Sequence, residues 1–145
     1  MVLVVIMFTA VGCAENNSSM ETYKQSTNEP NVVQITSRGF SPRTITIHAG
    51  DEVTWINKDL DPHWVASAVH PVHDAYTGAR YDEPGSYQGS RACIAEGRPK
   101  TGAFDACRTI SLGETYKFNF TQIGTWQYHD HMNYAFIGSV VVKRR

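Results

Sequence analysis

The chain has 145 residues and a formal net charge of -1, from 13 basic and 14 acidic side chains. This length suits one domain that is large enough to bury a hydrophobic core. The near-neutral charge argues against nucleic acid or an anionic lipid surface as the main partner. β-branched and aromatic residues are frequent and long patterns of helical period are absent, so the composition favours an all-β domain.

The N-terminus begins with a short apolar segment. Residues 2–12 are too few to span a bilayer and are typical of the apolar region of a secretory signal. Ala10-Val-Gly-Cys13 resembles a bacterial lipobox, in which cleavage precedes a cysteine that is then acylated. We therefore expect a signal peptide over residues 1–12 and a lipid on Cys13, which would anchor the protein in the membrane on the periplasmic or cell-envelope side. The alternative is an ordinary signal peptide in which Cys13 has no role.

The rest of the chain divides into a tether and a domain. Residues 13–30 are polar and lack periodicity, so they are expected to form a flexible tether, and residues 31–145 form the domain. With Cys13 lipidated, Cys93 and Cys107 remain as an even pair, which outside the cytoplasm normally forms a disulfide. Closing a loop of about fifteen residues would stabilise the fold by roughly 3 kcal/mol in the chain-entropy model. The alternative is that one of the two supplies a thiolate metal ligand.

Short alternating segments separated by turns follow one another along the domain. Phe40-Ser-Pro42 and Ala49-Gly-Asp51 are expected to be turns. Residues 66–110 are irregular and rich in Gly and Pro, and a loop of this length is usually functional, held by a disulfide, or both. Strands at such spacing suggest a β-sandwich. Period-two patterns predict strands over residues 31–36, 44–48, 52–57, 113–120, 125–129 and 138–142.

Histidines form the candidate metal site. Because residues i and i+2 of an extended strand share a face, the His-x-His pair near the C-terminus can point at one ion from the same side. Neutral imidazole suits copper and zinc, and an all-nitrogen site favours Cu(II). Asp74 and Asp130 are candidates to orient the rings, and His48 is expected to have no role. The five candidate ligands fall in two segments: His63, His70, His73, His129 and His131.

The order and spacing of these segments resemble the cupredoxin family, copper-binding β-sandwiches that include plastocyanin and azurin. The resemblance covers about residues 31–65 and 111–142 and implies a Greek-key sandwich in which the middle of the chain is an insertion. It also implies that the loops holding His63 and His131 meet at one end of the sandwich. The matching residues are Phe40-x-Pro42, Ile45-x-Ile47, Gly50-Asp-x-Val-Thr-Trp-x-Asn57, His63, Gly113-Glu-x-Tyr-x-Phe-x-Phe120, Gly124-Thr-Trp126, His131 and Gly138-x-Val-Val-Val142.

The sulfur ligands of the family's blue copper site are missing from this chain. That site uses a histidine after the Trp-containing strand, then Cys-x-x-His and a weakly bound methionine. His63 fills the first position, and aligning Gly138 puts His131 at the second histidine. Tyr128 and Phe136 then stand in place of the cysteine and the methionine. The resemblance therefore implies copper as the cofactor, without the copper–thiolate bond that gives the blue colour.

A second, partial resemblance concerns the same C-terminal segment. Gly124-Thr-Trp-Gln-Tyr-His-Asp-His131 is similar to the Gly-Thr-x-x-Tyr-His-x-His segment of multicopper oxidases, whose two histidines serve an all-imidazole copper cluster. His63-Trp64 is similar to their first His-Trp-containing motif. Those enzymes need further domains and a blue copper centre, which this chain lacks. The cupredoxin register turns His129 away from the copper, whereas the oxidase register turns it inward.

These observations predict an extracytoplasmic copper-binding lipoprotein with a histidine-rich, non-blue site, acting in copper binding or handling with a copper-transfer partner. The alternative is a single-electron carrier that serves a membrane or periplasmic redox partner. An enzymatic role is less favoured, because no acid–base pair or substrate pocket can be recognised in the sequence. A metal-free structural or adhesive sandwich is the remaining alternative.

Overall fold

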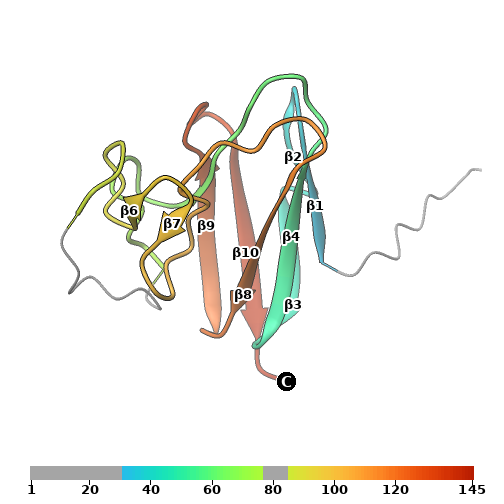
Figure 1. Ribbon diagram of the computed structural model, residues 1–145. Helices are drawn as coiled ribbons and strands as arrows, with labels where there is room; N and C mark the ends of the chain where they lie inside the picture. Colours follow the sequence, from blue (N-terminus) through green and yellow to red (C-terminus); the bar gives the residue numbers. More distant parts are fainter. Residues whose placement is uncertain (1–30, 77–84) are drawn as a thin grey trace, which may run out of the picture.

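The computed structural model describes residues 31–76 and 85–145, which contain β-strands and no helix (Figure 1). Within these ranges no helix is long and apolar enough to cross a membrane. The expected signal peptide, Cys13 and the tether up to residue 30 lie outside the described residues. The strands are β1 (Val32–Thr36), β2 (Gly39–Ser41), β3 (Thr44–His48), β4 (Asp51–Asn57), β5 (Val65–Ser67), β6 (Cys93–Ala95), β7 (Arg98–Pro99), β8 (Thr115–Phe120), β9 (Gly124–Asp130) and β10 (Ile137–Lys143).

Two four-stranded sheets form a sandwich. Their strand orders are β2-β1-β4-β8 and β3-β10-β9-β5, and β6 and β7 form a separate two-stranded sheet. Both large sheets are mixed: β1 runs parallel to β4, and β3 runs parallel to β10. This arrangement confirms the predicted all-β sandwich, and each of the six predicted strands corresponds to an observed one within about two residues at either end.

The structure adds four short strands that the sequence patterns did not reveal, and two of them, β2 and β5, belong to the large sheets. Phe40, expected in a turn, lies in β2 opposite Ile35, and its ring packs against the edge of Tyr128 at a centroid distance of 4.7 Å. β5 is only three residues long and pairs antiparallel with β9, Val65 lying opposite Asp130. Both strands are shorter than the four residues over which an alternating pattern becomes informative.

The main core lies between the two sheets and is rich in aromatic side chains. Trp55 of β4 is fully buried and contacts Phe120 of the neighbouring β8 and Tyr128 of β9 in the opposite sheet. Phe104 comes from the insertion and packs against Trp55 at a centroid distance of 5.2 Å. Large buried aromatics dominate the energetics of such a core. The insertion is therefore part of the folding unit and does not project freely from it.

The insertion also covers the outer face of β5. Val65 points into the main core, whereas its neighbours Trp64 and Ala66 belong to a second buried cluster. A disulfide joins Cys93 and Cys107 inside this cluster, with Cα atoms 5.6 Å apart. It confirms the predicted pairing and excludes both sulfurs as thiolate ligands. Figure 1 shows β6 and β7 beside β9, on the side of the sandwich away from β1 and β2. The remaining members of the cluster are Ala92, Ala103 and Ala106.

Candidate metal centre

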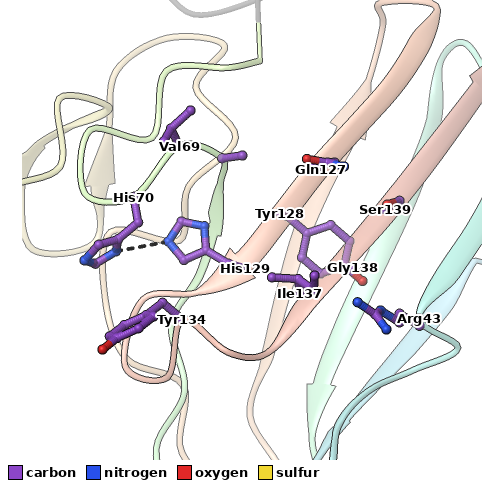
Figure 2. Close-up of a pocket in the computed structure, with 11 residues that line it drawn as sticks. Arg43, Val69, His70, Gln127, Tyr128, His129, Tyr134, Ile137, Gly138 and Ser139 are labelled. Carbon is purple, nitrogen blue, oxygen red and sulfur yellow. Dashed lines mark hydrogen bonds between the residues drawn. The ribbon is translucent and has the colours of Figure 1, made fainter.

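Four of the five candidate histidines converge at the seam between β9 and the insertion. Each offers one ring nitrogen, and these nitrogens all lie within 4.8 Å of one another. Nδ1 of His70 is 3.3 Å from Nε2 of His129, the contact drawn in Figure 2. Nδ1 of His131 is 3.0 Å from Nε2 of His73. The structure thus brings together two histidines from a loop after β5 and two from the end of β9.

The β9 histidines converge because of strand geometry. His129 and His131 are two residues apart, so their side chains leave the chain on the same side. Ala66 lies directly opposite His129 on β5, and its methyl group leaves room for the imidazole. Just past the strand, the backbone N–H of His131 donates to the carbonyl of Trp64 at 2.7 Å, and its ring lies 4.5 Å from the Trp64 ring. These contacts support the prediction that the pair faces one side.

A tight turn brings the other two histidines to the same place. The N–H of His73 donates to the carbonyl of Val69 at 2.8 Å, which folds the chain back so that the rings of His70 and His73 lie 5.8 Å apart. His73 adopts a left-handed backbone conformation with φ of 57°. Such a conformation is uncommon for a residue with a side chain, and residues held this way are found preferentially at functional sites.

Asp105 holds His73 from outside the cluster. Its Oδ2 lies 2.6 Å from Nδ1 of His73 and also accepts the hydroxyl of Ser90 at 2.8 Å. Its Oδ1 accepts the indole N–H of Trp64 at 2.5 Å and the backbone N–H of Cys107 at 2.7 Å. Because these four groups occupy the carboxylate, His73 must donate its Nδ1–H, and its Nε2 keeps a free lone pair. A carboxylate behind a histidine is the usual support of a metal ligand.

The electrostatics of the cluster favour neutral imidazoles. Burial lowers the pKa of His129 from 6.5 to about 4, and His73, His70 and His131 add to this shift because a second positive charge among them is disfavoured. Burial, followed by the neighbouring His73 and His70, also lowers the pKa of His131. A lowered pKa keeps the imidazoles of His129 and His131 neutral, and this is the protonation state that a metal ion requires.

The donor set fits a single copper ion. At metal–nitrogen distances of about 2.0–2.1 Å, neighbouring ligand nitrogens of a tetrahedral or square-planar site lie about 2.9–3.4 Å apart, and opposite ones about 4.1 Å apart. The two measured nitrogen pairs, at 3.0 and 3.3 Å, fall in the first range. All-imidazole coordination suits copper. The nitrogens of these two pairs are thus separated by the distances expected of neighbouring ligands of one ion.

His63 does not join this cluster, contrary to the expectation that it would share the site. Its ring is 4 % exposed, and its Nδ1 lies 2.7 Å from Oδ2 of Asp130. Its Nε2 faces Asp59 at 3.4 Å and makes no hydrogen bond of normal geometry. The same Asp130 accepts the backbone N–H groups of Trp64 and Met132. The two ring nitrogens of His63 are directed at Asp130 and Asp59 and not at the other imidazoles, so His63 stands apart from the four-histidine cluster.

The contact between His63 and Asp130 also shifts the alignment of the family's Cys-x-x-His pattern on this chain by two residues. Tyr128, aligned with the family's cysteine, points into the main core, where a side chain on the opposing Gly138 would overlap its ring. The residue that faces His63 is Asp130, two positions later. Cys-x-x-His then falls on Asp130-x-x-Asn133, and both lie with His63 and Phe136 around one cavity of about 390 Å³. At that position Asp130 and Asn133 stand in place of the cysteine and the second histidine.

Sequence patterns did not identify the residues that support the four histidines. Asp74, proposed as an orienting carboxylate, instead lies 4.0 Å from Arg91. Asp130 supports His63, and the carboxylate behind the cluster is Asp105. Asp105 lies two residues before Cys107, and the disulfide prediction was the only available indication that this segment is held in place.

Comparison with solved structures identifies the class of protein that this fold defines. A purple cupredoxin from Nitrosopumilus maritimus is 18% identical, with a TM-score of 0.52 over 77% of this chain and 98% of that chain. An oxidised variant of amicyanin is 24% identical, with a TM-score of 0.52 over 77% and 80% of the two chains. A second oxidised amicyanin variant is 23% identical, with a TM-score of 0.54 over 82% and 87%. The fold is therefore that of the cupredoxins.

The family follows from the sequence itself. Residues 28–143 match the family described as copper binding proteins, plastocyanin/azurin family. The match covers most of the chain, so this protein belongs to that family, and copper is its cofactor.

Proposed function

We propose that this protein holds one copper ion in a non-blue site through His70, His73, His129 and His131 and acts in copper binding or handling outside the cytoplasm. The observation that carries the proposal is the convergence of four ring nitrogens within 4.8 Å. Asp105 supports it, because it fixes the proton of His73 on the nitrogen that points away from the cluster. Copper binding agrees with the family of the chain.

The chemistry of the donors supports a site without blue colour. The intense absorption of blue copper arises from a thiolate ligand, and both cysteines of the described residues are joined in the disulfide. Exposure of the ligands is uneven: His70 is exposed, whereas His73 and His129 are buried. One accessible ligand gives a partner protein a side from which to exchange copper, which suits a role in copper handling.

Loading the purified protein with Cu(II) tests the site. We expect one equivalent to bind, with weak visible absorption and a paramagnetic resonance spectrum showing several equivalent nitrogen ligands. The His48→Ala variant is the matched control, because His48 is an exposed histidine on β3 and should leave both results unchanged. An intense blue colour would contradict the all-imidazole site, and so would failure to bind copper.

We further propose that the protein is a lipoprotein anchored in the cell envelope through Cys13. The lipobox-like Ala10-Val-Gly-Cys13 supports this, and the Cys93–Cys107 disulfide suits an oxidising compartment. Expression in a bacterium should yield a membrane-associated mature form whose N-terminal residue is acylated Cys13, as read by mass spectrometry. The Cys13→Ser variant should lack the acyl group and the cleavage that precedes it, and a mature wild-type protein without a lipid on Cys13 would contradict the anchor.

A single-electron carrier is the second candidate function, and one observation favours it. Exposed apolar side chains surround the accessible ligand: the rings of His70 and Tyr134 lie 5.6 Å apart, and Val69 and Tyr134 are 62% and 72% exposed. Such a surface suits brief docking of a redox partner. Voltammetry should then show a reversible copper couple with fast self-exchange. A slow, irreversible couple with ligand rearrangement would leave copper handling as the function.

A further inference from the structure

A pocket of about 360 Å³ adjoins the histidine cluster on one side. Only two of the four histidines, His70 and His129, contribute to its lining (Figure 2). Its floor and walls come from the end of β5, from β9 and from β10, so it lies on the outer face of the sheet. Its volume is at the lower end of the range for small-molecule sites, about 300–1,000 Å³.

The pocket has one charged end and no acidic lining. Arg43 lies at the opposite end from His70 in Figure 2, and no carboxylate among the described residues lines the pocket. Arg43 is exposed, and its guanidinium forms no ion pair with a carboxylate within residues 31–76 and 85–145. A guanidinium presents paired N–H donors that match a carboxylate.

The histidine end of the pocket is also suited to an anion. A divalent copper ion held by four neutral imidazoles keeps its full charge, and the supporting carboxylate of Asp105 approaches from the side of His73, which does not line the pocket. The pocket therefore lies between two positive centres when copper is bound. Opposite charges attract more strongly in such a partly desolvated recess than in bulk water.

Apolar surface separates the two ends. Val69 and Ile137 line the pocket and are 62% and 49% exposed, and the ring of Tyr134 completes this wall. Exposed aliphatic side chains that gather around a recess commonly mark a ligand-binding site. An inorganic anion would leave them uncovered, whereas an organic anion with a compact apolar body would cover them.

We propose that this pocket binds a small organic carboxylate, with its carboxylate on Arg43 and its apolar body between Val69 and Ile137, extending toward His70 and His129. The part of the inference that concerns the neighbouring ion rests on the proposed copper site. The part that concerns Arg43 stands on the metal-free protein. Bound copper and the carboxylate then favour each other, because the ion adds positive charge at the other end of the same partly desolvated pocket.

Calorimetric titration with benzoate, in the metal-free and the copper-loaded protein, tests the inference. We expect binding in both forms, tighter in the copper-loaded form. Arg43→Gln should weaken it about tenfold or more, since a charge-assisted pair is lost. Arg38→Gln is the matched control, because it removes the same charge from a residue outside this pocket. The neutral isostere benzamide should bind at least about tenfold more weakly than benzoate.

Each other result overturns a stated part of the inference. Equal affinity for benzamide would remove the charge argument, and unchanged affinity in Arg43→Gln would remove the site. Absence of benzoate binding in both forms would do the same. If benzoate binds through Arg43 while copper is not held by the four histidines, the anion site stands and the proposed function fails. If copper binds as proposed and benzoate affinity does not depend on Arg43, the proposed function stands and the anion site fails.

Discussion

Two histidine environments lie on either side of Asp130 and differ in what faces the ring nitrogens. The buried His63 lies between two carboxylates, with Asp130 at 2.7 Å and Asp59 at 3.4 Å. In the four-histidine cluster the inward nitrogens face one another, and the carboxylate of Asp105 contacts the outward nitrogen of His73. His63 and His73 thus both have a carboxylate at Nδ1, and they differ at Nε2, which faces Asp59 in His63 and the other imidazoles in His73.

The comparison also shows how the fold can lose one metal position and provide another. His63, Asp130, Asn133 and Phe136 line one cavity, and neither the cysteine nor the second histidine of the family pattern is among its lining residues. The new cluster uses the outer face of β9 and the insertion that covers β5. Family membership therefore predicts copper, while the ligand set has to be found from the geometry of this chain.

The largest expected effect comes from removing the β9 histidines. Replacing both His129 and His131 by Ala should lower copper affinity more than about 100-fold, beyond the 10–100-fold typical of outer-shell changes, because two of four donors are lost. Competition with a copper chelator measures the affinity. Circular dichroism should show a folded protein, since His131 is partly exposed. Retention of tight binding would place the copper elsewhere.

Disrupting the other environment should affect stability and leave copper in place. His63→Gln removes the imidazole that contacts the buried Asp130, and leaving a buried polar group without its partner costs about 1–3 kcal/mol of unfolding free energy. Denaturant titration of the metal-free protein measures this cost. Copper stoichiometry should stay at one equivalent. Loss of copper binding in a variant of unchanged stability would return His63 to the ligand set.

The sequence predicted the sandwich because its long strands have clear period-two patterns and its turns have glycines, and it predicted the disulfide by counting cysteines. The site was only partly predictable. His129 and His131 share a face by strand geometry alone, but the positions of His70 and His73 depend on a turn that no pattern specifies. His63 matched the family motif, yet its partner Asp130 comes from a strand that is distant in sequence.

Asp105 holds the proton of His73 on Nδ1 and so leaves its Nε2 available to a metal ion. Asp105→Asn should therefore lower copper affinity about 10–100-fold. The amide N–H₂ would donate to Nδ1 of His73, which moves the proton to Nε2 and blocks the lone pair that faces the cluster. Resonance spectra should show one nitrogen ligand weakened or absent. Asp74→Asn is the matched control, because it removes the same charge from a residue that faces the exposed Arg91 and lies outside the four-histidine group. Equal losses in both variants would assign the effect to net charge.

The smallest expected effect is the pH dependence of the metal-free protein. His129 has a pKa of about 4 when folded against 6.5 when exposed, so between these values the unfolded chain binds more protons. Unfolding free energy should therefore be fully present above pH 6.5 and fall as the pH drops toward 4. Denaturant titrations at both ends of this window, with and without copper, measure the slope.

Two comparisons identify the source of this slope. His129→Gln should flatten this slope. His48→Gln should leave it unchanged, because His48 is exposed on β3 and lies outside the four-histidine cluster. Bound copper should protect the protein through most of the window, because the ion and the proton compete for the same lone pairs. A slope that survives in His129→Gln at full size would mean that the burial of His129 and its neighbouring imidazoles does not control the titration.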